Sequence, residues 1–282
     1  MGFRPAANQI SNTKKTNTRV MRCTVLASGS KGNCAIIQGS SATLLIDAGL
    51  SAKELFRRMA AAGLDPEAIS AILVTHEHGD HIRGLDVTAR KLDVPVYATE
   101  GTLRDFLGFR KVSKKPLVHH TCRYHERFTI RDISVEPFAT SHDAAEPCGF
   151  ILTERDCRIG YCTDTGVMTP QMHSLLRPCD GIVLESNHCP DMLANGPYPE
   201  SLKRRIRSKH GHLSNQAAAE CLRGFGKDVP HVILAHLSEI NNTPEKARGT
   251  ARDGLGLFFE EEHVVVATQC GSCPDSLQEI RL

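Results

Sequence analysis

Four side chains able to bind a metal lie within six residues of this chain. They are His76, His78, Asp80 and His81, and they directly follow the apolar run 71–74. Imidazole and carboxylate together suit zinc or a similar divalent transition metal. A tight loop after a buried strand can aim His76 and His78 at one ion and Asp80 and His81 at a neighbouring ion. The spacing therefore predicts a metal centre at the end of a strand.

Side chains of the same kinds follow the ends of later apolar segments. Each comes immediately or a few residues after a short predicted strand: His142, Asp164, Glu185 and His236. Strand ends at one edge of a layered sheet converge in space, and rigid strands hold ligands accurately. We therefore expect these residues to meet the cluster at 76–81. For the last ligand, His188 and His212 are rivals of His236.

The elements that must position these residues alternate between strands and helices. Strands are predicted at 23–27, 34–38, 43–46, 71–74, 94–98, 133–138, 149–153, 158–162, 181–184, 232–235 and 263–267. Helices are predicted at 52–62, 84–91, 102–107, 199–209, 214–224 and 243–252, whereas 192–199 is predicted to be a loop and 108–131 has no assignment. This mixture, with ligands on the connecting loops, indicates an α/β sandwich.

Composition narrows the class of protein. The 282 residues are 40% hydrophobic and carry a net charge near +2, as in an ordinary globular protein that has no overall nucleic-acid signature. Eleven cysteines without a framework spacing indicate reduced thiols and a cytoplasmic protein. The single CxxC pair, Cys270 and Cys273, is more typical of a structural feature than of a metal site.

Two further expectations concern the ends of the chain and its setting. Residues 1–20 are polar, lack acidic groups and lack periodicity, which predicts a disordered extension before one domain at 21–282. The extension suits either a transit peptide or extra sequence before a true start at Met21. No apolar run is long enough to cross a membrane. The oligomeric state stays open, with a homodimer among the options.

The motif at 76–81 resembles the HxHxDH signature of the metallo-β-lactamase-fold hydrolases. The segment 44–49 is similar to the motif in that family whose aspartate, here Asp47, supports the ligand loop. A closer resemblance is to the YycJ/WalJ group, near the PhnP and ribonuclease Z branches. The segments that carry it are 27–33, 141–144, 185–188, 211–215 and 235–238.

This resemblance implies an αββα sandwich of two mixed sheets flanked by helices. It also implies a metal-dependent phosphodiesterase, namely a 5′-to-3′ DNA exonuclease linked to DNA repair. Three details agree with a phosphodiesterase branch. His142 lies in Thr-Ser-His-Asp and not in a Pro-Gly-His-Thr segment. The stretch from Asp164 to His236 is too short for the inserted domain of the β-CASP nucleases. His78 stands where flavodiiron proteins have a carboxylate.

The resemblance further implies two divalent metal ions, Zn²⁺ or Mn²⁺, with Fe²⁺ as another option. The first would be held by His76, His78 and His142, and the second by Asp80, His81 and His236. Asp164 would bridge the two ions, and a hydroxide activated by both would be the nucleophile. Glu77 is expected to point away from the metals.

The predicted catalytic residues are Asp80, His212 and Glu185. His212 would protonate the leaving oxygen, with Glu185 orienting it through a hydrogen bond, as a comparable pair does in the ribonuclease Z branch. The ordinary alternative is that His212 only caps a helix.

The predicted substrate contacts surround this centre: Lys31, Asn33, Ser186, Asn187, His188, Lys203, Arg204, Arg205 and Arg207. The basic run 203–209 would supply countercharge to phosphates, although a solvated helix face is the ordinary meaning of such a run. Aromatic residues make up 5% of the chain and show no stacking platform. DNA is therefore expected to be held by its backbone with low sequence specificity.

Two other functions compete with a DNA exonuclease. One is a hydrolase of small or cyclic phosphodiesters, similar to the PhnP branch. The other is a protein that binds metal without catalysis.

Overall fold

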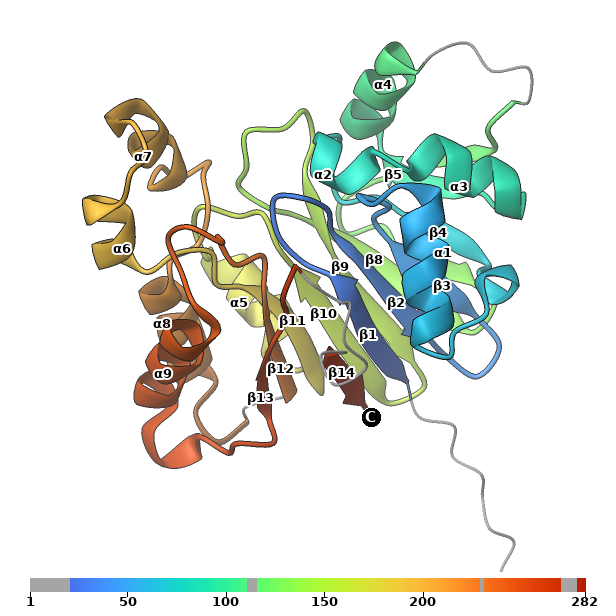
Figure 1. The fold of residues 1–282 in the computed structure, drawn as a ribbon. Coiled ribbons are helices and arrows are strands. Elements are labelled where there is room, and N and C mark those ends of the chain that lie inside the picture. Colours follow the sequence, from blue (N-terminus) through green and yellow to red (C-terminus); the bar gives the residue numbers. More distant parts are fainter. Residues whose placement is uncertain (1–20, 111–115, 229–230, 270–277) are drawn as a thin grey trace, which may run out of the picture.

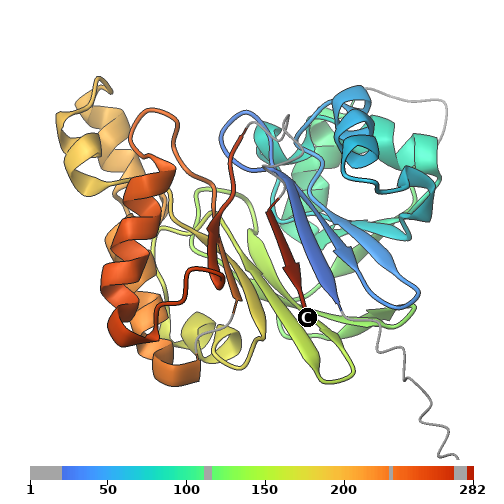
Figure 2. The same ribbon diagram turned by 60° about the horizontal axis from the view of Figure 1, so that its bottom comes forward.

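Two mixed β-sheets pack face to face, and helices cover their outer faces (Figure 1). The computed structural model describes residues 21–110, 116–228, 231–269 and 278–282. Within them each sheet has seven strands. Figure 2 shows the two sheets between two helical layers, so the predicted αββα sandwich is confirmed. The predicted extension at 1–20 and the pair Cys270 and Cys273 lie outside the described residues.

The first sheet contains the metal-ligand loop. Its strands, in spatial order, are β14 (Gln278–Arg281), β1 (Arg22–Ala27), β2 (Cys34–Gln38), β3 (Thr43–Ile46), β4 (Ala71–Leu73), β5 (Val96–Thr99) and β6 (His119–Cys122). The strands from β14 to β3 pair antiparallel, and those from β3 to β6 pair parallel.

The second sheet brings together the later predicted ligands. Its spatial order is β13 (Val264–Val266), β12 (His231–Ala235), β11 (Gly181–Glu185), β10 (Cys157–Cys162), β9 (Cys148–Glu154), β8 (Ile133–Ala139) and β7 (Phe128–Ile130). The strands from β10 to β13 run parallel, and those from β7 to β10 run antiparallel.

The helices divide between the two outer faces. On the side of the first sheet lie α1 (Ala52–Ala61), α2 (Gly79–Ile82), α3 (Leu85–Leu92) and α4 (Glu100–Phe109). On the side of the second sheet lie α5 (Pro170–Leu176), α8 (Asn215–Phe225) and α9 (Pro244–Leu255), with α6 (Pro190–Asn195) and α7 (Glu200–Ile206) beyond them. Short 3₁₀ turns η1 (Pro66–Ala68), η2 (Gly226–Asp228) and η3 (Gly256–Phe258) connect elements.

Local sequence explains where the main helices begin. The hydroxyl of Ser51 accepts from the amide of Glu54 at the start of α1, and that of Ser214 accepts from Ala217 at the start of α8. Such N-caps satisfy amides that have no partner inside the helix. The two helices therefore begin within one residue of the predicted starts at 52 and 214.

Three apolar layers hold the sandwich together. One lies between the sheets and includes Ile37 and Phe150, a second joins the first sheet to α1, α3 and α4, and a third joins the second sheet to α5, α8 and α9. Burial of apolar surface at ~25 cal/mol per Å² makes such layers the main stabilising term. They fix the two sheets relative to each other, and with them the strand ends that carry the site.

Some predicted elements differ from the structure. The segment 192–199 was expected to be a loop, but α6 runs to Asn195, because Pro190 begins a helix well and the break comes only at Gly196. The helix expected at 199–209 ends at Ile206. The unassigned segment 108–131 contributes β6 and β7. No helix in the described part of the chain is long and apolar enough to span a membrane.

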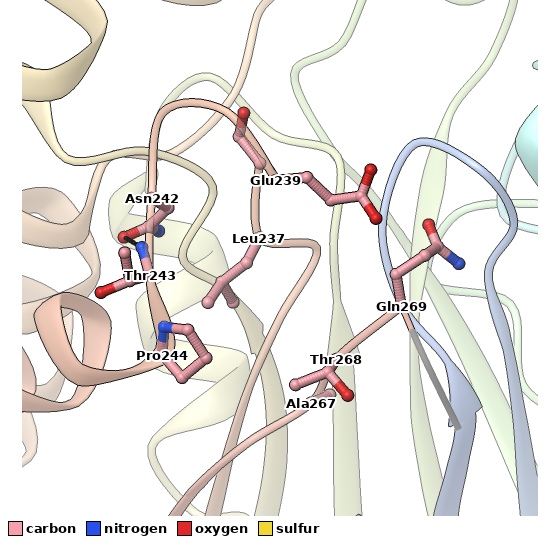
Figure 3. A pocket seen from close by; sticks show the side chains of 9 residues that line it. Leu237, Glu239, Asn242, Thr243, Pro244, Ala267, Thr268 and Gln269 are labelled. Atoms are coloured by element: carbon pink, nitrogen blue, oxygen red, sulfur yellow. Dashed lines mark hydrogen bonds between the residues drawn. The ribbon is translucent and has the colours of Figure 1, made fainter. Parts of the chain in front are cut away.

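A pocket of about 270 Å³ opens between the loop after β12 and the end of β13. Its lining includes Leu237, Glu239 and Gln269 (Figure 3). Leu237 directly follows His236, so this pocket borders the edge of the sandwich where the predicted ligands gather.

Candidate metal centre

The seven predicted metal ligands come together in space. Their potential ligand atoms form overlapping groups whose members lie within 4.8 Å of one another. Three of the groups are His76, His78 and His142; Asp80, His81 and His236; and His76, His81 and Asp164, and a fourth joins Asp164 and His236 to Glu185 and His212. The first two groups are the two predicted ligand sets, and the third places Asp164 with residues of both.

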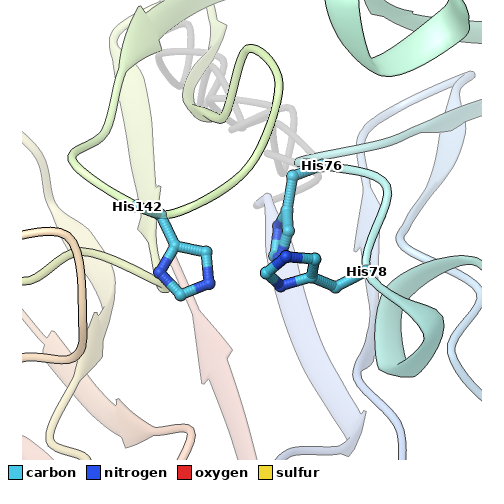
Figure 4. Close-up of side chains that lie close together, drawn as sticks. All are labelled: His76, His78 and His142. Carbon is cyan, nitrogen blue, oxygen red and sulfur yellow. The ribbon is translucent and has the colours of Figure 1, made fainter. Parts of the chain in front are cut away.

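Each half of the cluster comes from strand ends. The ligand loop follows β4 in the first sheet, whereas Asp164, Glu185 and His236 follow the parallel strands β10, β11 and β12. The carboxyl ends of neighbouring parallel strands lie at one edge of a sheet, so these three side chains must be near each other. Figure 4 shows His142 facing His76 and His78 across the gap between the sheets.

The backbone at three of these positions is unusual. Asp47, Asp164 and His236 have positive φ angles of 58°, 55° and 57°. Non-glycine residues rarely adopt this left-handed conformation, and it persists only where the surroundings hold it. One such hold is the hydroxyl of Ser28, which accepts from the His236 amide at 2.7 Å. Packing of the strand ends therefore maintains a strained backbone that directs two predicted ligands.

The protein fixes one nitrogen of each ligand imidazole and leaves the other for a metal. A carbonyl or carboxylate can only accept, so the nitrogen that contacts it carries the hydrogen. Nδ1 of His142 donates to the Gly211 carbonyl at 3.0 Å, and Nε2 of His78 donates to the Asp143 carbonyl at 3.2 Å. The same arrangement, with outer partners setting the tautomer, is typical of metal-bound histidines.

Asp47 contacts the second half of the ligand loop. Its buried carboxylate accepts from Nδ1 of His81 at 2.7 Å and from the amide and hydroxyl of Thr75 at 2.8 Å each. Because the Thr75 hydroxyl donates its hydrogen to Asp47, its oxygen can accept a hydrogen bond from Nδ1 of His76, which lies 3.0 Å away. One carboxylate thus sets two ligand rings; Nε2 of His76 has no partner among the described residues, whereas Nε2 of His81 lies 3.1 Å from the amide nitrogen of Asn33.

Several buried polar atoms at this point have no hydrogen-bond partner among the described residues. They are Nε2 of His76, Nε2 of His236 and Oδ2 of Asp164. A buried polar atom without a partner costs free energy, and a bound cation would satisfy all three. Neutral imidazoles and carboxylates are also the donor set that divalent transition metals accept. The residues present therefore fit a metal ion.

Protonation states agree with this fit. Burial lowers the pKa of His76 well below its ordinary value, which keeps the ring neutral. Burial alone would raise the pKa of Asp164, but the nearby His236 and His81 outweigh it and hold the pKa below the usual range. The same balance, with His236 and His81 as partners, lowers the pKa of Asp80. Metal ligands must be deprotonated, and these three groups are, whereas the neighbouring carboxylates raise the pKa of His81 and His236, whose protons a metal ion would have to displace.

Glu185 joins the predicted proton donor to the last ligand. Its Oε1 accepts from Nδ1 of His212 at 2.8 Å and from Nδ1 of His236 at 3.0 Å, while Oε2 accepts from the amides of Thr165 and Leu213. Burial opposes ionisation of Glu185, but His212 and His236 hold its pKa far below the usual range. His212 is thus oriented by a carboxylate, and its Nε2 is left over beside the metal cluster.

Glu77 points away from the cluster, as expected. Its carboxylate accepts from the amide of Ala145 at 2.6 Å and from the hydroxyl of Thr102 at 3.4 Å. Ala145 lies three residues after His142, so Glu77 ties the ligand loop to the loop that carries the third histidine.

Four of the predicted substrate contacts have side chains that are buried and engaged within the protein. Ser186 bonds to Asn215, and the Asn187 amide donates to the carbonyl of His236. Asn33 lies with its amide nitrogen 3.3 Å from Asp80 and 3.1 Å from His81, so it supports ligands. The ammonium of Lys203 donates to the Ala194 carbonyl at the end of α6.

The remaining predicted contacts differ in exposure. His188 is also buried, and burial lowers its pKa to about 4. Lys31 is exposed and lies 2.7 Å from Glu239. The other three are the arginines of the basic run, Arg204, Arg205 and Arg207, and they are partly or fully exposed.

Arg205 lies nearest the centre. It grips the carboxylate of Asp143 through two hydrogen bonds of 2.6 and 3.0 Å. Asp143 is the residue after His142, and its carbonyl accepts from His78. Asp143 therefore holds Arg205 beside the cluster of predicted ligands, because Asp143 lies on the loop that carries His142.

Sequence reasoning missed the residues that act through their backbone or a hydroxyl. Thr75, Ser28, Gly211 and Asp143 all hold ligand side chains or the ligand backbone. Thr75 could have been found because it directly precedes the first ligand. The other three contribute generic groups from distant loops, and no residue type marks them.

Comparisons with known proteins identify the family of this chain. The Beta-lactamase superfamily domain matches residues 42–237. The chain is 42% identical to exodeoxyribonuclease YycJ of Bacillus anthracis, covering 84% of this chain and 92% of the relative. It is 39% identical to exodeoxyribonuclease WalJ of Streptococcus pneumoniae, covering 84% and 91%.

Solved structures share the fold at low identity. The metallo-β-lactamase fold protein YhfI from Bacillus subtilis superposes with a TM-score of 0.71 at 15% identity, covering 92% of this chain and 99% of that chain. A diphosphatase from the PhnP family superposes with a TM-score of 0.67 at 18% identity, covering 93% and 98%. The chain belongs to the β-lactamase superfamily, in the group of metal-dependent hydrolases that includes YycJ and WalJ.

Proposed function

We propose that this protein is a DNA exonuclease that uses two divalent metal ions, Zn²⁺ or Mn²⁺, and digests strands in the 5′-to-3′ direction. The observation that carries the proposal is the pair formed by Glu185 and His212 beside the ligand cluster. The names of the relatives YycJ and WalJ support DNA as the substrate.

The ligands divide between two ions in this proposal. His76, His78 and His142 would hold one, Asp80, His81 and His236 would hold the other, and Asp164 would contact both. When bound, such ions lower the pKa of water and offset the negative charge that develops on phosphate. The grouping of ligand atoms within 4.8 Å supports this division.

The protein itself supplies the proton for the leaving oxygen. Nδ1 of His212 donates to Glu185, which fixes the ring, so that Nε2 can carry a proton to the substrate. Glu185 is ionised and receives two backbone amides, so it stays in place while His212 changes charge. This arrangement is needed for a poor leaving group such as a deoxyribose alkoxide.

The basic residues that remain exposed define how DNA would be held. With Lys203 buried, Arg204, Arg205 and Arg207 are left for phosphates, and Arg205 is nearest the cluster because it grips Asp143. Few cations at the site predict a short footprint and modest dependence on salt. A DNA phosphate would draw Arg205 only partly away from Asp143, because the side chains of both residues are open to water.

A hydrolase of small or cyclic phosphodiesters is the second candidate. It is favoured by the same shortage of free cations: Arg207 lies 3.7 Å from Glu200 and Arg205 is paired with Asp143. A small substrate needs less countercharge than a DNA strand.

End-labelled substrates separate the two candidates. The purified protein is incubated with Mn²⁺ or Zn²⁺ and with 5′- or 3′-labelled DNA and RNA, in single- and double-stranded form, beside a cyclic nucleotide. Early release of the 5′ label from DNA, with little loss of RNA, is expected. Intact DNA beside rapid turnover of the cyclic nucleotide would show that the second candidate is right.

A ligand variant tests the metal assignment. Asp164→Ala removes the residue shared by the two ligand sets, so both activity and bound metal should be lost. Asp253→Ala, an exposed carboxylate on α9, is the matched control and should keep both. Mass-spectrometric metal analysis reports the content, and a variant that keeps both ions would contradict the shared role of Asp164.

We further propose a role in DNA repair and a cytoplasmic location, because the names of YycJ and WalJ are those of enzymes that act on DNA. Cells that lack the gene should be more sensitive to DNA-damaging agents, and the wild-type gene but not the Asp164→Ala variant should restore resistance. Fractionation should recover the protein with cytoplasmic markers. Normal resistance in the deletion strain would remove the repair role.

A further inference from the structure

A second hollow lies beside the ligand loop. It has a volume of about 490 Å³ and is bounded by the ligand loop, α2 and the end of α4. Its walls include Glu77, Gly79, Arg83, Phe106 and Phe109. This volume is within the range of about 300–1,000 Å³ that is usual for small-ligand sites. The hollow is therefore large enough for part of a nucleotide.

One wall of this pocket is aromatic. Phe106 and Phe109 are three residues apart on α4, so both rings lie on the same face of the helix. Phe106 is buried, but Phe109 is 76% exposed. A lone exposed apolar side chain is ordinary. Phe109 differs because it lines a pocket that shares a wall with the metal cluster.

The shared wall is the ligand loop itself. Glu77 and Gly79 alternate with the ligands His76, His78 and Asp80 along the chain. A Cβ built on Gly79 would meet nothing within 4 Å, so the space beside the loop is open. The pocket therefore lies on the side of the ligand loop to which Glu77 points, one residue along the chain from the ligands.

The pocket also carries a cation. Arg83 is exposed, and its guanidinium donates to the carbonyl of Lys31. Within the described ranges no carboxylate forms an ion pair with Arg83, whereas the other arginine of the pocket, Arg110, is bound to Asp86. An exposed ring and a cation in one pocket match the base and the phosphate of a nucleotide.

We infer that this pocket binds one base of the DNA strand, next to the phosphate that is cleaved. Phe109 stacks on the base, and Arg83 contacts the adjoining phosphate. The inference rests on the proposed function and deepens it. Stacking on a ring tolerates every base, so the low sequence specificity expected from the composition is retained, although an aromatic contact is present after all.

The test compares Phe109→Ala with wild type on two sets of oligonucleotides. One set has every base, and the other lacks a single base at successive positions from the 5′ end. Stacking energies predict a loss of about five- to a hundredfold in kcat/KM for Phe109→Ala on the intact strand. Removing the base at one position should slow wild type by a similar factor and should not slow the variant further.

Three controls separate stacking from damage to the fold. Phe109→Trp should keep wild-type kinetics, since it offers another ring. Leu257→Ala on η3, where the side chain is fully exposed, should have no effect. Metal content and melting temperature should be equal in wild type and Phe109→Ala.

The outcomes also separate this inference from the proposed function. The base pocket is wrong if wild type digests DNA and Phe109→Ala digests it equally fast. It is also wrong if the loss caused by Phe109→Ala and the loss caused by removing a base add at every position. In both cases the proposed exonuclease activity stands. If wild type digests no DNA but turns over small phosphodiesters, the exonuclease and the base pocket both fall.

Discussion

Replacing His212 by alanine should slow the hydrolysis of DNA while leaving the bound metal unchanged. Nδ1 of His212 donates to Oε1 of Glu185, but the same carboxylate also holds His236 and two backbone amides. These three contacts remain in the variant, so the last predicted ligand keeps its orientation. The change is therefore confined to the proton that His212 carries.

The expected loss of rate follows from the removal of this proton donor. A positioned general acid contributes about 10²–10⁴-fold to rate. The loss should appear in kcat for DNA, whose leaving oxygen needs a proton. It should be small for bis(p-nitrophenyl) phosphate, because nitrophenolate leaves as a stable anion without protonation.

The assay measures both substrates with one preparation, together with metal content. His210→Ala is the matched control, because His210 lies two residues away in the same loop, is exposed, and contacts Ser141 instead of Glu185. Wild-type rates are expected for this control. Equal losses on the two substrates, or loss of metal from His212→Ala, would show that His212 is a structural or ligand residue and that the proton-transfer reasoning is wrong.

Three other changes test how the site is built. Gly49→Ala should prevent metal binding and lower the melting temperature, because a Cβ there would collide with the carbonyl of Asp80. The control Gly249→Ala in α9 meets open space and should be neutral or slightly stabilising. Normal metal content in Gly49→Ala would contradict this prediction. Asp47→Asn should weaken metal binding by about 10–100-fold in a metal titration, since it alters the partner of a ligand imidazole, and unchanged affinity would deny that role. His188 has its pKa lowered by burial to about 4, so the unfolded state takes up the proton first and stability should fall as pH drops from 6.5 towards 4. His188→Asn should make the melting temperature nearly independent of pH over this range. A pH dependence equal to that of wild type would show that His188 does not cause the loss of stability.

Much of the architecture could be predicted from local signals. The strands at 34–38 and 43–46 have the predicted bounds, and α1 and α8 begin within one residue of their predicted starts, after the caps Ser51 and Ser214. Short apolar runs between turn residues, and hydroxyl caps before periodic segments, are local properties of the chain. Weakly patterned pieces such as α6 and β6 were missed, because contacts made elsewhere decide their state.

The candidate site shows the same division. We could predict the residue types that can bind a metal and their order along the chain. Both depend on the identity of single residues and on short spacings after strands. The substrate contacts were less predictable. Lys203 and Arg205 lie in one basic run, yet one ammonium is buried against α6 and the other cation reaches Asp143 at the cluster.

By itself, the sequence determined the kind of chemistry: a His- and Asp-rich cluster after a strand, with later ligands at later strand ends. Only the tertiary structure decided which nitrogen of each histidine is free, because the partners that hold the others, such as Gly211 and Asp143, are backbone carbonyls from distant loops. It also decided that Phe109 lines a pocket beside the ligand loop. Side-chain identity is local, whereas hydrogen-bond partners and exposure depend on how the two sheets and their helices pack.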